Sequence, residues 1–190
     1  MSFRRKLATA VLALSIAIGG SQALANQELF TELEEAAQSV RQLELLEPVD
    51  VEVVTREEYR EAQLETIEDE ANVEGSEDWN TLLVFLDFID DDQDIYEIYS
   101  GFLGDQVLGS YAPETEELIV VSNDPEDWNI TNRITYVHEV VHALQDQHFD
   151  LLWVFGDPET LTDDRYYATR SLAEGDAGVA ESMFILENNL

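Results

Sequence analysis

The three histidines of the chain all fall between positions 138 and 148. His138 and His142 are four residues apart with Glu139 beside the first, which is the pattern HExxH. On an α-helix, residues four apart lie on one face about one turn from each other, so both imidazoles can reach one ion. Imidazole nitrogens bind zinc at about 2.0–2.1 Å. The spacing therefore predicts a zinc site held by His138 and His142.

Glu139 stands where a carboxylate can reach a water molecule on such a metal without binding the metal itself. Zinc lowers the pKa of bound water to about 7 and polarises a carbonyl oxygen. A nearby carboxylate can then accept a proton as the water attacks the carbonyl carbon. We therefore expect Glu139 to be a general base. The alternative is a helix whose histidines merely pack or face solvent, and the clustering of all the histidines at ligand spacing disfavours it.

A catalytic zinc site needs a third protein ligand, and Glu174 is the first candidate. It lies in the run Ser171–Gly178, where Ala177 and Gly178 share its helical face and would let two helices approach closely. The alternative is a solvated Glu174 that pairs with Arg170, four residues earlier. We expect Glu174 to be the third ligand.

His148 is the second candidate, because it completes the spacing of a three-histidine zinc site. Such sites carry glycine where this chain has Gln145, since the chain leaves the helix there in a left-handed conformation that costs other residues about 1 kcal/mol or more. If the helix continues, His148 points about 80° away from His138. We therefore expect His148 to contact substrate, donate a proton or lie at the surface near the helix end, and not to bind zinc.

Three further features have weaker chemical interpretations. Tyr167 lies on the helical face of Glu174 and could donate to an oxyanion, although a core tyrosine is the plainer interpretation. Asp176 could be an outer partner of a histidine, although it points away from the face of Glu174. The segment Leu118–Val121 could be a sheet edge that pairs with an extended peptide, or equally a core strand.

Hydrophobic periodicity predicts the elements that position these residues. Apolar residues at helical spacing predict helices at 27–47, 79–89 and 95–103. The sequence Thr55-Arg56-Glu57-Glu58 is a capping box, which begins a further helix that we expect to end near Asp69. Alternating or β-branched runs predict strands at 51–54, 106–111 and 118–121, the last two joined by a turn at 113–116.

Two helices carry the predicted ligands. The motif helix is expected to begin at Thr131 or Asn132, either of which could cap it, and to end near His148. The last helix begins at Asp163 and still has an apolar face at 184–186, so we expect the chain to be short or truncated. The result is an α+β domain in which a small mixed sheet with an edge hairpin packs on the motif helix.

The first residues have the three parts of a secretory signal peptide. These are a basic start, an apolar run and an A-x-A cleavage site, namely residues 4–6, 7–20 and 23–25. The apolar run is short for a membrane span. We therefore expect residues 1–25 to be removed and the mature protein to be secreted or held at the cell surface. Residues 26–49 would form a helical segment, and 50–190 the catalytic domain.

The composition excludes several classes of site. The chain has no cysteine, which excludes a thiolate metal site, a cysteine nucleophile and stabilisation by disulfides. Nine basic residues stand against 42 acidic ones. Three of the basic residues lie in the signal peptide, so the mature chain would carry 6 − 42 = −36 and no lysine. A surface so negative disfavours nucleic acid as a partner, and 45% apolar residues disfavour a disordered acidic chain.

This acid excess predicts adaptation to a very salty medium. Self-repulsion weakens a compact state, and at 1 M salt the Debye length falls to about 3 Å, which screens most of the repulsion. We therefore expect the mature protein to unfold at a lower temperature in dilute buffer than at molar salt. Thermal unfolding over a series of NaCl concentrations measures this, and a midpoint that ignores ionic strength would contradict the interpretation.

The motif His138–His142, followed by Glu174-Gly175-x-Ala177, resembles the gluzincins, the thermolysin-like zinc peptidases whose third ligand is a glutamate on a later helix. A closer resemblance covers roughly residues 50–190. There the run HALQDQHFD at 142–150, with Tyr111–Thr115 upstream, is similar to a family of exported prokaryotic proteins, some of them surface proteins of halophiles.

The resemblance implies a zincin-like fold and peptidase activity. It also implies zinc as the cofactor, a peptide or protein as the substrate, Glu139 as the base and three ligands, which are His138, His142 and Glu174. The chain departs from the thermolysin-like pattern at Gly178, where that pattern has an acidic residue that contacts a ligand histidine. It also ends sixteen residues after Glu174, whereas a C-terminal subdomain usually completes the cleft.

Three functions therefore stay open. The first is an extracellular peptidase. The second is a non-catalytic cell-surface protein with a structural or relic zinc site, which a fourth protein ligand such as His148 would favour. The third is an acidic binding module without metal.

Overall fold

A computed structural model of the chain describes residues 27–62, 76–95, 98, 107–124, 128–156 and 162–190. The predicted signal peptide lies outside the described residues. The described residues divide into two compact units. One lies within Thr55–Val107, and the other combines the described residues up to Val54 with Leu108–Leu190. All the predicted ligands belong to the second unit.

The second unit contains a mixed sheet of three strands in the order β1-β3-β2. β1 (Asp50–Val54) runs parallel to β3 (Glu117–Val121), and β2 (Gly109–Ala112) is antiparallel to β3 in a hairpin. β3 is the central strand because its apolar run is buried on both faces, which suits a position between two partners. The interpretation of Leu118–Val121 as a sheet edge is therefore wrong, and β2 lies at an edge of the described sheet.

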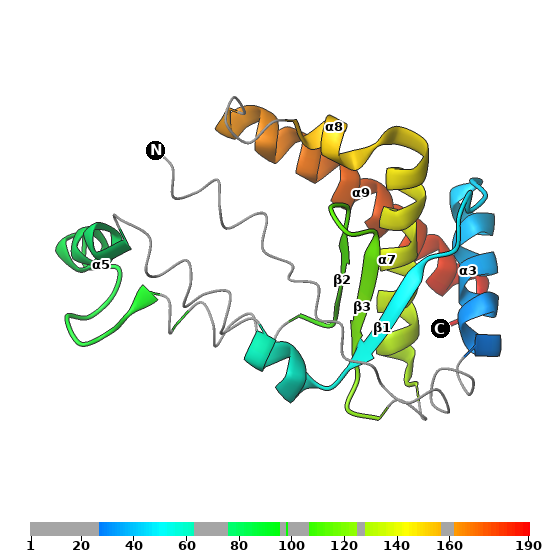
Figure 1. Ribbon diagram of the computed structural model, residues 1–190, viewed down its shortest axis with the longest axis horizontal. Coiled ribbons are helices and arrows are strands. Elements are labelled where there is room, and N and C mark those ends of the chain that lie inside the picture. Colours follow the sequence, from blue (N-terminus) through cyan, green and yellow to red (C-terminus); the bar gives the residue numbers. More distant parts are fainter. Residues whose placement is uncertain (1–26, 63–75, 96–97, 99–106, 125–127, 157–161) are drawn as a thin grey trace. The chain divides into compact units, whose positions relative to one another are not determined.

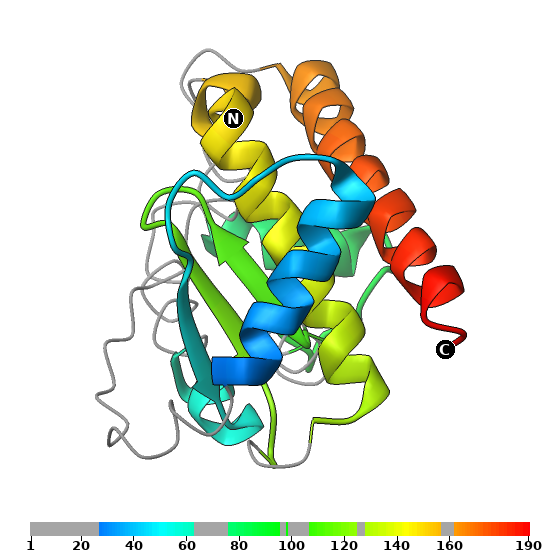
Figure 2. The same cartoon turned by 90° about the vertical axis from the view of Figure 1, so that its right-hand side faces the viewer.

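Helices cover one face of this sheet. α7 (Ile130–Phe149) packs against β2 and β3, and it also packs against α3 (Gln27–Arg41) and α9 (Asp163–Glu187). Figures 1 and 2 show α7 between the sheet and these two helices. The short helix α8 (Leu151–Phe155), which the sequence did not predict, follows α7 and contacts α9. The mixed α+β class is confirmed, and α7 is the element that contacts α3, α8, α9, β2 and β3.

The core joins α3, α7, α9 and the sheet. Tyr136, on the buried side of α7, is fully buried. Its ring stacks on Phe30 at 5.0 Å and meets Trp128 edge-on at 5.6 Å, and its hydroxyl donates to Glu34 Oε1 at 2.9 Å. The other buried apolar residues of the cluster come from all these elements and include Leu33, Val40, Leu118, Val120, Val140, Leu144, Ala177 and Phe184. This packing fixes the rotation of α7 and therefore which of its side chains face α9.

The two ends of α7 are set by Asn129, whose side chain caps the first turn, and by Asp150, whose backbone leaves the helix. Asn129 is the N-cap, since its side chain accepts from the backbone N–H groups of Thr131 and Asn132. The expectation that Thr131 or Asn132 is the cap was therefore wrong by two residues or more. The helix continues past Gln145 and ends at Asp150, which has the left-handed φ of 55°. Aspartate tolerates that conformation better than glutamine does.

Other predicted boundaries hold less well. α3 ends at Arg41 and not near 47, because Gln42 adopts a left-handed φ of 58°. In the other unit, Thr55 and Glu58 form the predicted capping box, with Glu58 N–H donating to Thr55 Oγ1 and Thr55 N–H donating to Glu58 Oε2. The helix there is described only over 56–62, and α5 (Ser76–Phe85) ends before the predicted 89. Most of 95–103 lies outside the described residues.

Among the described residues, no helix combines the length and apolar character needed to cross a bilayer.

Gly109 lets β2 approach α7 closely. A Cβ at this position would lie 2.7 Å from Thr135 Cγ2, 3.2 Å from Glu139 Cγ and 3.2 Å from the Ile119 carbonyl oxygen. Thr135 is short and β-branched, so it has little freedom to move away. The close packing of β2 on the part of α7 that carries Thr135 and Glu139 therefore requires glycine at position 109.

We expect Gly109→Ala to lower the free energy of unfolding by about 1–3 kcal/mol, as overpacking of a full site does. Gly178→Ala is the matched control, because a Cβ there meets nothing within 4 Å, and alanine in a helix is more stable than glycine by up to about 1 kcal/mol. Chemical denaturation at molar salt measures both variants. Equal stability of the two would show that β2 does not pack on α7 at Gly109.

Candidate metal centre

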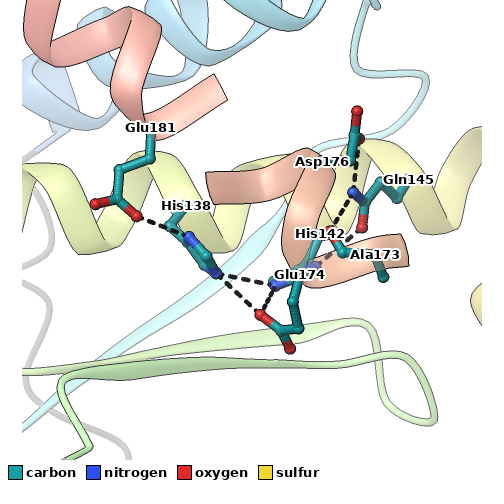
Figure 3. Close-up of polar contacts among 7 residues, drawn as sticks. All are labelled: His138, His142, Gln145, Ala173, Glu174, Asp176 and Glu181. Atoms are coloured by element: carbon teal, nitrogen blue, oxygen red, sulfur yellow. Dashed lines mark hydrogen bonds and ion pairs between the residues drawn. The ribbon is translucent and has the colours of Figure 1, made fainter. Parts of the chain in front are cut away.

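The structure brings three of the predicted site residues together. His138 and His142 project from successive turns of α7, and Glu174 projects from α9 (Figure 3). One ligand atom from each lies within 4.8 Å of the others. The nearest atoms are His138 Nε2, His142 Nε2 and Glu174 Oε2, with separations of 3.2, 3.3 and 3.4 Å. The three residues form one cluster at the contact between α7 and α9.

The other nitrogen of each imidazole has its own acceptor. His138 Nδ1 donates to Glu181 Oε2 at 3.0 Å, and His142 Nδ1 donates to Gln145 Oε1 at 3.0 Å. A carboxylate or amide oxygen cannot donate in return, so both imidazoles carry their proton on Nδ1. Each Nε2 then presents a lone pair toward the other and toward the Glu174 carboxylate. Three acceptors facing one point repel each other unless a cation or protons lie among them.

The spacing of these acceptors suits zinc. In a tetrahedral site with bonds of about 2.0–2.1 Å, neighbouring ligand atoms lie about 3.3 Å apart. The three separations in the cluster match that edge length within 0.1 Å or so. Two imidazoles and one carboxylate also favour zinc or a similar transition metal over calcium and magnesium, which prefer oxygen ligands. The donors and their geometry therefore fit the predicted cofactor.

In the absence of metal, protons have high affinity for the cluster. The Glu174 carboxylate is the main cause that raises the pKa of His138 to about 9, and Glu139 and Glu181 add to it against the effect of burial. At His142, burial lowers the pKa, but Glu174 and Glu139 outweigh it and the net pKa is raised. The two imidazoles in turn hold the pKa of Glu174 well below its usual range. A site that attracts protons so strongly also attracts a cation.

Glu139 lies on the side of α7 that packs against the edge strand β2. It is only 8% exposed, and burial raises the pKa of its carboxyl above the usual value. His142, His138 and the backbone N–H of Tyr111 on β2 oppose this rise. The Tyr111 hydroxyl also donates to Asp146 on α7 at 2.9 Å. Tyr111 therefore joins β2 to α7 at two points, Glu139 within the HExxH motif and Asp146 four residues after it, and holds the Glu139 carboxylate in place.

The remaining candidates lie elsewhere. His148 stays on the continuing helix, and its Nε2 lies 2.8 Å from the Glu44 carbonyl oxygen, so it is not part of the metal cluster. Tyr167 is 57% exposed and contacts the ring of Tyr166, which excludes the core interpretation; its role toward an oxyanion stays a prediction. Arg170 lies over the rings of Phe155 and Tyr166, at 5.0 and 5.5 Å from their centroids.

Of the two small residues expected to let α9 approach α7, only one does so. Ala177 is fully buried in the core, together with its neighbours Ala173 and Ala180. Gly178 faces open space, because a Cβ there meets nothing within 4 Å. The close approach of the two helices therefore depends on three alanines spaced along one side of α9.

The sequence did not identify the outer partners of the histidines. The acidic residue that contacts His138 is Glu181, seven residues after Glu174, instead of the expected four. It lies two turns along the same face of α9, and that spacing is the signal that would have found it. Gln145 contacts His142 and, through its amide, Asp176. Asp176 is therefore one step removed from the histidine of which it was predicted to be a partner.

Comparison of the chain with protein-family models, with curated proteins and with solved structures gave no match. What the site can do must therefore be argued from its own residues.

Proposed function

We propose that this protein is a zinc-dependent peptidase. The observation that carries the proposal is the triangle formed by the two Nε2 atoms and Glu174 Oε2, whose edges match the ligand spacing of a tetrahedral zinc ion. The Glu174 side chain is 54% exposed, so the metal position borders solvent, as a catalytic site requires and a closed structural site does not.

Each residue then has a role that its surroundings support. His138, His142 and Glu174 would hold zinc, which supplies a water of lowered pKa and a polarised substrate carbonyl when bound. Glu139 would accept the proton from the attacking water. Its raised pKa suits a base that must later pass the proton to the leaving amine. The N–H of Tyr111 keeps the Glu139 carboxylate oriented while it does so.

β2 is the strand to which an extended substrate could add. In the hairpin, Val121 N–H donates to the Leu108 carbonyl oxygen, and the antiparallel pattern then turns the backbone groups of Gly109 and Tyr111 away from β3. The Tyr111 N–H is bonded to Glu139, so Gly109 is the residue whose backbone groups a peptide could meet. A peptide bound in this way would lie beside Glu139 and the metal cluster. We propose a peptide or protein as the substrate and, from the sequence of the first 25 residues, a site of action outside the cell.

The test is an assay of peptide cleavage at molar salt on protein of known zinc content. We expect about one zinc per chain, cleavage of a mixed peptide library, loss of both after dialysis against a chelator, and recovery on adding zinc. Cleavage that survives removal of the metal would overturn the proposal. Stoichiometric zinc without cleavage would favour the non-catalytic surface protein, and absence of zinc would favour the acidic binding module.

A further inference from the structure

Gln145 occupies the position at which three-histidine zinc sites carry glycine, and here it lies between the metal cluster and the partly buried ion pair of Arg41 and Asp176. Its side chain is almost fully buried, with the residue 4% exposed. The amide oxygen faces His142 Nδ1 at 3.0 Å. The amide nitrogen donates to the Ala173 carbonyl oxygen at 3.0 Å and to Asp176 Oδ2 at 2.7 Å. All of these partners are visible in Figure 3.

The partners leave the amide one orientation. A backbone carbonyl and a carboxylate can only accept hydrogen bonds, so the Gln145 group that faces Ala173 and Asp176 must be the NH₂. The oxygen must then face His142, and an oxygen can only accept. His142 therefore keeps a proton on Nδ1 and leaves Nε2 free for a metal.

A third helix fixes this arrangement. Arg41, in the last turn of α3, donates from Nε to the same Asp176 Oδ2 atom at 2.7 Å. Asp176 thus accepts from Arg41 and from Gln145 together. The chain of contacts runs from α3 through α9 to α7 and ends on a predicted ligand, although Arg41 and His142 are far apart in the sequence.

We infer that Gln145 is a positioning residue for the metal centre, and that Asp176 and Arg41 hold its amide so that His142 Nε2 faces the metal. The inference rests on the proposed zinc site and adds a condition to it: zinc affinity depends on the docking of α3, which lies outside the HExxH motif. Outer partners of zinc-bound histidines typically contribute 10- to 100-fold to metal affinity.

The experiment compares zinc dissociation constants of full-length mature variants by competition with a chromophoric chelator at molar salt. We expect Gln145→Met to weaken zinc binding about 10- to 100-fold. Arg41→Gln, which leaves the amide and Asp176 in place, should weaken it less but in the same direction. Gln147→Met is the matched control on α7, because the Gln147 amide bonds to the backbone of Leu46 and Glu47 and not to a metal ligand. This variant should bind zinc as the wild type does.

A second measurement separates positioning from general destabilisation. Histidine ¹⁵N spectra of the metal-free protein, taken at a pH where both imidazoles are neutral, report which nitrogen carries the proton. We expect Nδ1–H at His142 in the wild type and in Gln147→Met, and a mixture of tautomers in Gln145→Met. Unchanged affinity together with an unchanged tautomer would overturn the inference. Failure of the wild type to bind zinc would overturn the proposed function instead.

Discussion

Glu139→Gln is expected to abolish peptide cleavage while leaving zinc bound. Glutamine keeps the shape of the side chain and can still accept from the Tyr111 N–H, but it cannot take a proton from water. General-base catalysis of this kind contributes about 10²- to 10⁴-fold, so kcat/KM should fall by at least a hundredfold. Zinc content and dissociation constant should stay close to those of the wild type, because Glu139 is not in the ligand cluster.

The same substitution should not weaken the fold. Burial raises the pKa of Glu139, so the favourable contribution of its protonated form is present at low pH and is lost as the pH rises through the raised value. Glutamine keeps the shape of the side chain and cannot ionise, so the variant does not lose this contribution as the pH rises. The metal-free variant should therefore be at least as stable as the metal-free wild type. Glu32→Gln, on the exposed side of α3, is the control for the amide substitution. Full activity of Glu139→Gln would refute the assigned role.

The ligands could be predicted from the sequence because their relationship is local. His138 and His142 are one turn apart on α7, and α7 remains helical through both. The same local argument placed His148 off the metal, and the continuing helix shows why: Asp150, not Gln145, takes the left-handed conformation. Glu174 could be named as a candidate from its small neighbours, and the buried Ala177 shows that part of that reasoning was sound.

The contacts that orient the ligands depend on how the helices cross, and no local pattern encodes a crossing. Glu181 reaches His138 only because α9 lies along α7 at a fixed rotation, which the buried alanines and Phe184 set. Gln145 is three residues from His142 on α7, but the partners that orient its amide, Ala173 and Asp176, lie on α9. Strand order has the same origin. The sequence of Leu118–Val121 fits an edge strand and a central strand equally well. It becomes the central strand because β1 and β2 pair with it on its two sides.

Glu174→Gln is expected to weaken zinc binding by on the order of a thousandfold, more than the 10- to 100-fold that loss of an outer partner costs. The substitution removes the negative charge of the carboxylate ligand. Its Oε2 atom lies 3.3 Å from His138 Nε2 and 3.4 Å from His142 Nε2. Glu181→Gln, which alters only an outer partner of His138, should fall in the smaller range. Glu187→Gln, exposed near the end of α9, should have no effect.

The role of Glu174 can also be tested through the pH dependence of zinc binding. In the metal-free wild type, Glu174 is the main cause that raises the pKa of His138 to about 9, so at any lower pH zinc must displace a proton. Affinity should therefore rise about tenfold per pH unit on approaching pH 9 and level off above it. In Glu174→Gln the main cause of the raised pKa is gone, so the rise should end at a lower pH. Equal pH profiles for the two proteins would show that Glu174 does not face His138 in the metal-free site.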